Sequence, residues 1–344
     1  MGIINNVTLF ATELLEPTKS THFVASILEW ISGWVGGYGW TVVVFTILVS
    51  VVLSPLDVWQ KMVMYRNAKI MQRMKPQMEK LQKQYGNNPE RLQQEQLRLF
   101  RKEKYSVAGA CLPIIATMVV FFIVWAGFNA TTKFKAEQNY VDAYNAYATA
   151  ADKFKEETDL SPESEAYEEG WKAAGDAAVL AEYKTESFLW VGNIFMPDNW
   201  SSIIPNEDTF RGGGLGKIDS NIGKNAVYSY SDVMSAVSNK YNTRWNGYLI
   251  LPVLSIVLTY MSIFLSKKFN RQSAVDATAQ NSMKFMQIVM PVLMGVFALI
   301  YSAAFTIYLV TRSIISTVVQ LVFNVCVNLK NKRDEDKRLS TTFK

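Results

Sequence analysis

The sequence predicts an all-α, polytopic membrane protein with five transmembrane helices and a helical hairpin on the cytoplasmic side. Apolar residues make up 49% of the 344, and they gather into four long tracts that almost lack charge. The charged residues, 19% of the total, lie between these tracts. Such segregation is expected where lipid is one of the solvents. The single histidine and two cysteines (His22, Cys111 and Cys326) are too few and too scattered for a His/Cys zinc site or a CxxC redox motif, so we expect no metal and no cofactor.

Three of the tracts, residues 38–56, 107–127 and 248–265, are close to the about 20 residues that cross about 30 Å of hydrocarbon as a helix. The fourth tract, residues 285–327, holds one charged residue, Arg312. It is about twice too long for a single span at about 1.5 Å per residue. We therefore predict two spans joined by a tight turn around residues 301–304.

These spans divide the chain into ten segments. In order, they are an outer amphipathic N-terminal segment (1–37), the first span (38–58), a cytoplasmic helical hairpin (59–104), the second span (105–128), an extracellular loop domain (129–247), the third span (248–265), a cytoplasmic loop (266–284), the fourth span (285–303), the fifth span (304–327) and a basic cytoplasmic tail (328–344).

The distribution of charge predicts the orientation. Residues 59–104 carry 12 Lys/Arg against 4 Asp/Glu, residues 266–284 carry 4 against 1, and the tail from residue 328 carries 6 against 3. Residues 1–37 carry one Lys against three Glu, and residues 128–247 carry 11 basic against 18 acidic side chains. By the positive-inside rule the chain has its N-terminus outside and its C-terminus in the cytoplasm. No basic region followed by an A-x-A site is seen at the N-terminus, so we expect no cleavable signal peptide.

The segments outside the membrane carry local helix signals. Phe23, Ile27, Leu28, Ile31 and Val35, together with Trp30 and Trp34, predict an amphipathic helix in the outer interface. In the cytoplasmic segment, Gly86-Asn87-Asn88-Pro89 predicts the turn of the hairpin. The Met/Leu stripe of this hairpin (Met62, Met71, Met74, Met78 and Leu81) is either its packing seam or a pliable surface for apolar partners. Its basic residues suit an anionic leaflet, with ribosomal RNA as the alternative and no DNA expected.

The outer loop predicts an αα-hairpin interrupted at residues 160–163, where Ser161 can cap and Pro162 can open the second helix. The aromatic-rich residues 188–200 are expected to return to the membrane surface. The glycine run at residues 212–217 lacks the spacing of a phosphate-binding loop, and we interpret it as a flexible loop.

Two polar stripes run through the spans. Thr46, Ser50 and Ser54 recur every four residues in the first span, and the last span carries Tyr308, Arg312, Ser316 and Gln320 at the same interval. A lipid-facing arginine at mid-bilayer costs at least about 2.5–3.5 kcal/mol, so Arg312 is expected to face protein or a water-filled cavity that it could share with Ser50. The structural alternatives are hydroxyls bonded to their own helix, and an Arg312 that snorkels or pairs with Asp57.

Several stretches, in this order, resemble the five-span core of the YidC family of membrane-protein insertases. They are YGWTVVVFTILVSVVLSPL, MQRMKPQMEKLQKQYGNNPERLQQEQLRLFRKEK, GACLPIIATMVVFF, FLWVGNIFMPD, and MKFMQIVMPVLMGVFALIY followed by IYLVTRSIISTVVQ. The resemblance leaves out residues 130–185 and 203–243. It implies five spans around a hydrophilic groove that is open to the cytoplasm and to lipid. It also implies that nascent membrane proteins are received there, alone or beside the Sec translocon, in the cell membrane of a bacterium of Gram-positive type.

The sequence departs from the family pattern inside the groove. Ser50 stands where the family has its groove arginine, and Thr117 stands where many relatives have Gln. Arg312 occupies a position that is usually small and uncharged. Our hypothesis is that the groove charge has moved from Ser50 to Arg312. The groove residues expected to contact substrate are Arg312, Ser50, Thr46, Ser54, Thr117, Tyr308 and Ser316.

The function expected from these features is insertion of membrane proteins, not enzymatic catalysis. The partners expected are nascent membrane proteins, the lipid bilayer, and the Sec translocon and ribosome. One alternative is an assembly adaptor that acts through the outer loop. Another is a secondary transporter or channel that uses the polar cavity, although no internal repeat of the spans supports it.

Overall fold

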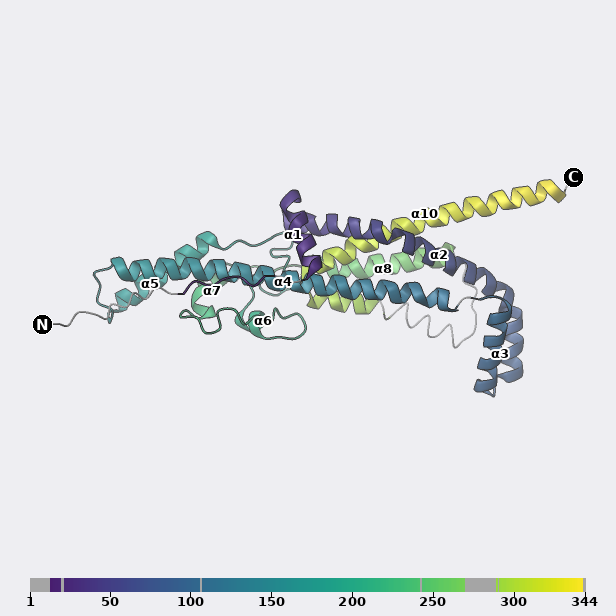
Figure 1. Ribbon diagram of the computed structural model, residues 1–344, viewed down its shortest axis with the longest axis horizontal. Helices are drawn as coiled ribbons and strands as arrows, with labels where there is room; N and C mark the ends of the chain where they lie inside the picture. Colours follow the sequence, from purple (N-terminus) through teal and green to yellow (C-terminus); the bar gives the residue numbers. More distant parts are fainter. Residues whose placement is uncertain are drawn as a thin grey trace. The chain divides into compact units, whose positions relative to one another are not determined.

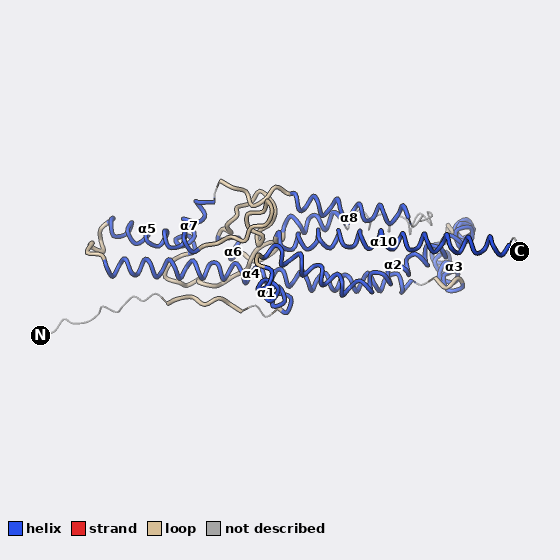
Figure 2. Tube along the Cα trace, turned by 90° about the horizontal axis from the view of Figure 1, so that it is seen from above, coloured by secondary structure: helices blue, strands red, loops and turns tan. Residues whose placement is uncertain are grey.

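The computed structural model describes residues 13–19, 22–105, 107–241, 243–269, 289 and 291–342. Helix is the regular secondary structure throughout these ranges, with isolated antiparallel bridges at Phe188–Val191 and Ser202–Trp245, so the predicted all-α class is confirmed (Figures 1 and 2). The helices are α1 (Phe23–Val35), α2 (Tyr38–Tyr85), α3 (Pro89–Lys102), α4 (Val107–Glu157), α5 (Glu165–Glu182), α6 (Glu207–Arg211), α7 (Tyr230–Tyr241), α8 (Ile250–Phe269) and α10 (Ala303–Thr342).

Three helices among the described residues are long and apolar enough to cross a membrane: α2, the part of α4 from Ile115 to Glu157, and the part of α10 from Ala303 to Arg333. Shorter apolar helices occupy Ile250–Leu265 and Pro291–Ile300. The chain leaves helical geometry at Tyr301 and Ser302, within the stretch where a turn was predicted. Most of the predicted cytoplasmic loop 266–284 lies outside the described residues.

Helix α2 passes from the predicted first span into the hairpin that was predicted to be cytoplasmic without a break, although it contains Pro55 and Pro76. Helix α4 likewise joins the second span to the outer loop. A proline inside a helix removes one i→i−4 hydrogen bond, and the neighbouring turns can hold the helix together across it. The segments that hydropathy separates are therefore single helices.

The described chain divides into two compact units. Unit 1 comprises Met1–Thr41, Trp125–Ile250 and Ala298–Phe305, and unit 2 comprises Val42–Val124, Leu251–Phe297 and Thr306–Lys344. Unit 2 contains the hairpin of α2 and α3 (Figure 1). Unit 1 contains the outer loop domain with α5, α6 and α7.

The hairpin is closed by the capping signals that the sequence carries. Asn88 accepts a hydrogen bond from the Arg91 N–H at 3.1 Å, and Pro89 is the first residue of α3. Its seam is a buried cluster of Met74, Met78 and Leu99, with Ile70, Met71, Leu81 and Phe100 packed around it. Met62 is 39% exposed and lies outside the cluster. The Met/Leu stripe is thus a packing seam, and Met62 was wrongly assigned to it.

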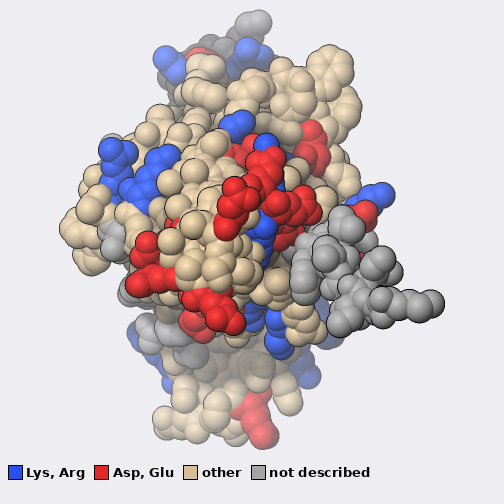
Figure 3. All heavy atoms as spheres, turned by 90° about the vertical axis from the view of Figure 1, so that its left-hand side faces the viewer, with Lys and Arg blue, Asp and Glu red and all other residues tan. Residues whose placement is uncertain are grey.

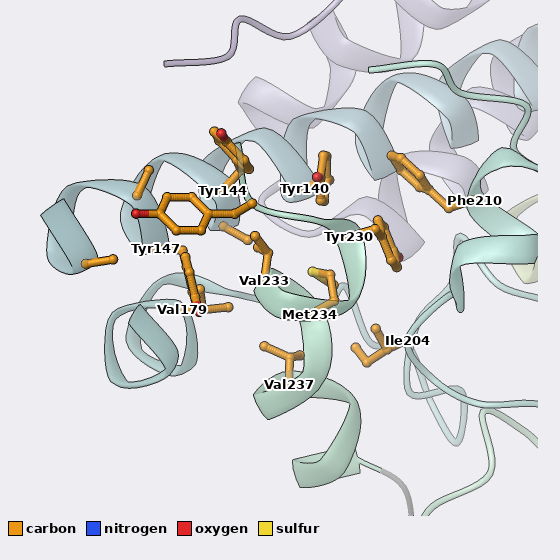
Figure 4. Close-up of a cluster of buried hydrophobic side chains, with 14 of the residues drawn as sticks. Tyr140, Tyr144, Tyr147, Val179, Ile204, Phe210, Tyr230, Val233, Met234 and Val237 are labelled. Carbon is orange, nitrogen blue, oxygen red and sulfur yellow. The ribbon is translucent and has the colours of Figure 1, made fainter. Parts of the chain in front are cut away.

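Unit 1 has a core rich in tyrosine. Its members lie on α4, α5, α6, α7 and the segments between them: Tyr140, Ala143, Tyr144, Tyr147, Ala148, Ala151, Val179, Ile203, Ile204, Phe210, Ile218, Tyr228, Tyr230, Val233, Met234 and Val237. In Figure 4 Tyr140, Tyr144 and Tyr147 come from α4, and Phe210 of α6 lies beside Tyr230 of α7, with the two ring centroids 4.9 Å apart. The outer loop is therefore a packed domain. Its buried residues all fall within 130–185 and 203–243.

The turn between α4 and α5 differs in detail from the prediction. Ser164, not Ser161, is the N-cap of α5, and its side chain accepts from the Tyr167 N–H at 3.2 Å. Ser161 instead supplies a carbonyl to the Ser164 N–H, and Pro162 lies in the turn. Figure 3 views the end of the molecule where this turn lies and shows Asp and Glu side chains gathered in several groups there. This agrees with the acidic composition of the outer loop.

The glycine run after α6 forms a turn-rich loop. Gly213, Gly214 and Gly216 have positive φ angles of 56°, 101° and 75°, which glycine adopts at no steric cost. A Cβ on Gly216 would lie 2.7 Å from the carbonyl oxygen of Ile300. Close backbone packing explains this glycine.

The predicted N-terminal helix forms as α1 but has two apolar faces. Val24, Ala25, Leu28 and Ile31 are buried in unit 1. The exposed face carries Phe23, Ile27, Trp30 and Trp34. Leu28 and Ile31 were therefore wrongly grouped with the outward residues.

The segment after α5 is held inside unit 1 by a buried asparagine. The Asn246 side chain accepts from the Asn193 N–H at 2.7 Å and donates to the carbonyls of Asn193 and Pro197. Two carbonyls of this segment accept hydrogen bonds from the start of α10. The Ala303 N–H donates to the Met196 carbonyl, and the Ala304 N–H donates to the Ile194 carbonyl. Residues 188–200 were expected to lie at the membrane surface. Only some of them, including Leu189 and Trp200, are exposed.

Candidate functional site

A polar face shared by α2 and α10 is the candidate site. Both helices are long and mainly apolar, and in each the polar residues recur at intervals of about four, which places them along one side. Both stretches belong to unit 2. Three side-chain contacts show that the two polar sides face each other, and these contacts define the site.

The central contact joins Arg312 to Asp57. The Arg312 Nη2 donates to both carboxylate oxygens of Asp57, at 3.0 and 2.8 Å. The side chains are 20% and 12% exposed, respectively. A charge pair that is largely removed from solvent holds together strongly, because loss of either partner leaves the other buried and uncompensated. The structural alternative for Arg312, a pair with Asp57, is therefore present in the structure.

Further contacts continue this face toward the end of α10. The Lys61 Nζ donates to the Gln320 Oε1 at 2.7 Å, and the Gln320 Nε2 donates to the Asn324 Oδ1 at 2.8 Å. The Tyr65 hydroxyl and the Asn331 side chain are joined at 3.0 Å. Residues 57, 61 and 65 of α2 contact residues 312, 320 and 331 of α10, respectively. Because both sets ascend in the same direction, α2 and α10 run parallel here.

Three buried polar atoms on this face have no hydrogen-bond partner within the described part of the chain. They are the Ser50 Oγ, the Arg312 Nη1 and the Asn324 Nδ2. Ser50 is 3% exposed. A buried polar atom left unpaired costs roughly 1–3 kcal/mol, so such atoms normally have water or a bound group as partner. The face therefore offers donors and an acceptor that the protein does not use itself.

The predicted hydroxyls divide into two kinds. The Thr46 Oγ1 donates to the Val42 carbonyl at 2.7 Å, and the Ser54 Oγ donates to the Val51 carbonyl at 2.8 Å. These two hydroxyls bond to their own helix, as the structural interpretation expected. The Ser50 hydroxyl does not.

Two of the other predicted residues lie on α10, and the third lies on a different helix. Tyr308 is buried one turn before Arg312, and Ser316 is half-buried one turn after it. Thr117 is half-buried on α4, outside the contacts that define this face. Lys61 and Asn324 belong to the face but not to the predicted stripes. Both could have been found by extending each stripe, because Lys61 follows Asp57 by four residues and Asn324 follows Gln320 by four.

The residues that the structure describes contain no group of three or more His, Cys, Asp or Glu side chains able to hold a metal ion. The chemistry available on this face is hydrogen bonding and charge, supplied by one arginine, one lysine, one aspartate and several amides and hydroxyls. Such groups can hydrate a cavity and bind polar peptide groups inside the apolar layer.

Comparisons with known proteins match most of the chain. The family model described as 60Kd inner membrane protein matches residues 30–331. A protein named membrane protein insertase YidC, from Clostridium perfringens (strain 13 / Type A), is 25% identical over 316 residues, which is 92% of this chain and 89% of that protein. The protein of the same name from Aromatoleum aromaticum is 35% identical over 99 residues, which is 29% of this chain and only 17% of that protein. The one from Caldanaerobacter subterraneus is 31% identical over 100 residues, or 29% of this chain and 47% of that protein.

Proposed function

We infer the function from one premise: this chain belongs to the 60Kd inner membrane protein family, and it acts as a membrane-protein insertase. It receives nascent membrane proteins, its clients, on the polar face of α2 and α10, and it releases their helices sideways into lipid. Ser50, Arg312 and Asn324 each have a buried polar atom without a partner among the described residues, within helices that are mainly apolar. This observation supports the assignment of the function to this face.

Such a face lowers the main barrier to insertion. The outer tail of a client must cross hydrocarbon, where each unsatisfied backbone group costs several kcal/mol. Polar atoms that hold water partway across the membrane shorten the apolar path. A client helix needs no such help, because its apolar side chains favour lipid. The face therefore acts on the polar segment and leaves the helix to partition by itself.

Arg312 supplies the selective part of the mechanism. One guanidinium nitrogen, Nη2, is held by Asp57, which orients the side chain, while Nη1 remains available to a client carboxylate or carbonyl. In this proposal Arg312 takes the role that the family gives to an arginine at the position of Ser50. Thr117, Tyr308 and Ser316 complete the contact surface, with Thr46 and Ser54 as its helix-bonded members.

The sidedness of the chain follows from its charge. We place the N-terminus and residues 129–247 outside the cell membrane, with the α2–α3 hairpin and the tail in the cytoplasm, as in a Gram-positive bacterium. The basic hairpin is then positioned to meet a translating ribosome or the Sec translocon. Neither contact is needed for the mechanism on the polar face.

A neutral double variant separates the charge of Arg312 from its structural bond. Asp57→Asn with Arg312→Gln replaces the ion pair with two neutral amides and removes both charges. We expect the variant to fold, and we expect insertion of a client with an acidic outer tail to fall at least about tenfold, since a charged hydrogen bond is worth about 1.5–3 kcal/mol. Protease protection of the client in proteoliposomes measures insertion.

Two comparisons make that result decisive. A matched client with a neutral outer tail should insert at close to the wild-type rate into the same proteoliposomes. Arg312→Ala with Ser50→Arg should recover much of the activity that Arg312→Ala loses. Wild-type insertion of the acidic client by the neutral pair would show that Arg312 serves only the fold. Photocrosslinking from positions 50, 117 and 312 to stalled clients tests the contact directly.

A further inference from the structure

Residues 13–19, Glu-Leu-Leu-Glu-Pro-Thr-Lys, lie as an extended strand of chain against α4 in unit 1 (Figure 2). One side chain of α4 binds both polar groups of a single residue in this strand. The Leu15 N–H donates to the Asn145 Oδ1 at 2.8 Å, and the Asn145 Nδ2 donates to the Leu15 carbonyl at 2.9 Å. These two hydrogen bonds bind the backbone of an extended peptide, in the way that a sheet edge binds the backbone of an added strand.

The Leu15 side chain fills a specific place in the domain. It packs against the tyrosine-rich core, of which Tyr140 is a member (Figure 4). A Cβ on Gly223 would lie 2.9 Å from the Leu15 Cδ1 and 2.8 Å from the Tyr140 ring. Gly223 has a φ of 65°. A glycine at this point therefore leaves room for the leucine between the loop and the ring.

The buried carboxylate of Glu137 binds Thr18, which follows Leu15 by three residues in the strand. Glu137 is only 2% exposed. Its Oε2 accepts from the Thr18 hydroxyl, and its Oε1 accepts from the Ser220 hydroxyl at 2.6 Å. Ser220 belongs to the domain, whereas Thr18 belongs to the strand. The bound segment therefore donates one of these two hydrogen bonds to the carboxylate, and the domain donates the other.

The strand is held by few contacts. Six of its seven residues are exposed, and Leu15 alone is partly buried. Pro17 biases Glu16 toward extended geometry, so little conformational entropy is lost when the segment binds. Among the described residues, the segment has one apolar anchor and three hydrogen bonds, and a segment held in this way opens at low free-energy cost. The surface beneath residues 13–19 is therefore a preformed binding site, and these residues can leave it.

We propose that this surface, formed by Glu137, Tyr140, Asn145, Ser220 and Gly223, is a binding site for extended peptides with a leucine followed three residues later by threonine or serine. Residues 13–19 occupy it in cis and compete with peptides supplied in trans. That the trans ligand is the translocated outer segment of a client rests on the proposed function. Such a segment is extended, polar and on the same side of the membrane, so it has the chemistry that the site recognises.

The test uses the full chain in nanodiscs and a fluorescein-labelled, capped peptide of residues 13–19. A released variant, Leu15→Asp with Thr18→Val, weakens the cis ligand without touching the site. We expect the peptide to bind the released variant at least about tenfold more tightly than wild type, because a tethered competitor acts at millimolar effective concentration. Adding Asn145→Ala should weaken binding about tenfold, and a Thr18→Val peptide should bind several-fold more weakly.

Asn139→Ala provides the matched control, because this asparagine lies on the same helix and donates to the Lys184 carbonyl instead of the strand. It should leave peptide affinity unchanged. Hydrogen exchange at Leu15 in wild type gives a second measurement, and excess peptide should accelerate it. Equal binding by wild type, the released variant and Asn145→Ala would overturn the site. Peptide binding is measured without a client, so it stands or falls independently of the insertion assay.

Discussion

At the scale of single residues, the hydroxyls of α2 show how side-chain geometry separates residues that the sequence pattern treats alike. Thr46, Ser50 and Ser54 have the same chemistry and the same spacing, and no sequence pattern separates them. In the structure Thr46 and Ser54 bond to carbonyls of their own helix, and Ser50 is left without a partner among the described residues. Whether a carbonyl is within reach depends on the side-chain rotamer, which neighbouring helices select. Ser50 is for this reason the most informative hydroxyl of the stripe.

A second residue, Asp176 on α5, predicts how the outer domain responds to pH. Burial raises the pKa of this carboxyl above its ordinary value. The folded domain therefore binds the proton more tightly than the unfolded chain does, and this stabilisation is full below the unfolded pKa and is lost as the pH rises through the folded pKa. Asp176→Asn should raise the midpoint of thermal unfolding at pH 7 and flatten its dependence between about pH 4 and pH 7.

Asp159→Asn is the control for that measurement, because Asp159 is exposed in the turn between α4 and α5. Circular dichroism of the full chain against temperature at several pH values reads the outcome. An Asp176→Asn variant that melts below wild type at pH 7 would contradict the assignment. The carboxylate would then be making a favourable contact in its charged form.

At the scale of elements, the packing of α5 on α4 requires a glycine. A Cβ on Gly175 would lie 2.5–2.8 Å from ring atoms of Tyr147. The interruption at residues 160–163 predicts the two helices and their hairpin, because turn and capping residues are local signals. No local signal marks Gly175, since a close approach between helices depends on which faces meet.

Gly175→Ala should destabilise the outer domain by about 1–3 kcal/mol, because the added methyl overpacks the interface with Tyr147. Gly33→Ala is the matched control. Gly33 lies inside α1, and a Cβ added there would meet no atom within 4 Å, so the same change should stabilise by about 0.5–1 kcal/mol. Urea unfolding followed by far-ultraviolet circular dichroism measures both. Equal effects of the two substitutions would show that α5 does not pack on α4 as described.

At the scale of the whole molecule, two stretches separated by 17 residues form one hydrophobic core. Residues 130–185 and 203–243 jointly supply every buried residue of the tyrosine-rich core. Between them, residues 186–202 hold the backbone at Ala303 and Ala304 through Ile194 and Met196. The hydrophobic core of this domain and its backbone contacts with the start of α10 thus come from different stretches of the chain.

Deletion of both stretches should therefore be tolerated better than deletion of either one. Removing residues 130–185 alone strips the partners from α7 and exposes its apolar face, which favours aggregation. Removing both, with short Gly/Ser linkers, should leave insertion of a simple client within about threefold of wild type. Yield of membrane-embedded protein and the protease-protection assay measure the two properties. Loss of insertion by the double deletion, with normal yield, would favour the adaptor that acts through its outer domain.

The sequence alone determined the membrane class, the apolar spans and the hairpin turn at Asn88 and Pro89, because hydropathy, charge and capping are properties of neighbouring residues. The motifs in their order also pointed to the family. Only the tertiary structure decided that Arg312 pairs with Asp57, that Ser50 has no partner in the described part of the chain, and that Leu15 lies against Asn145. Each of these joins or separates groups that are distant along the chain. Partner choice at such distances is set by how the helices pack, and no local pattern encodes it.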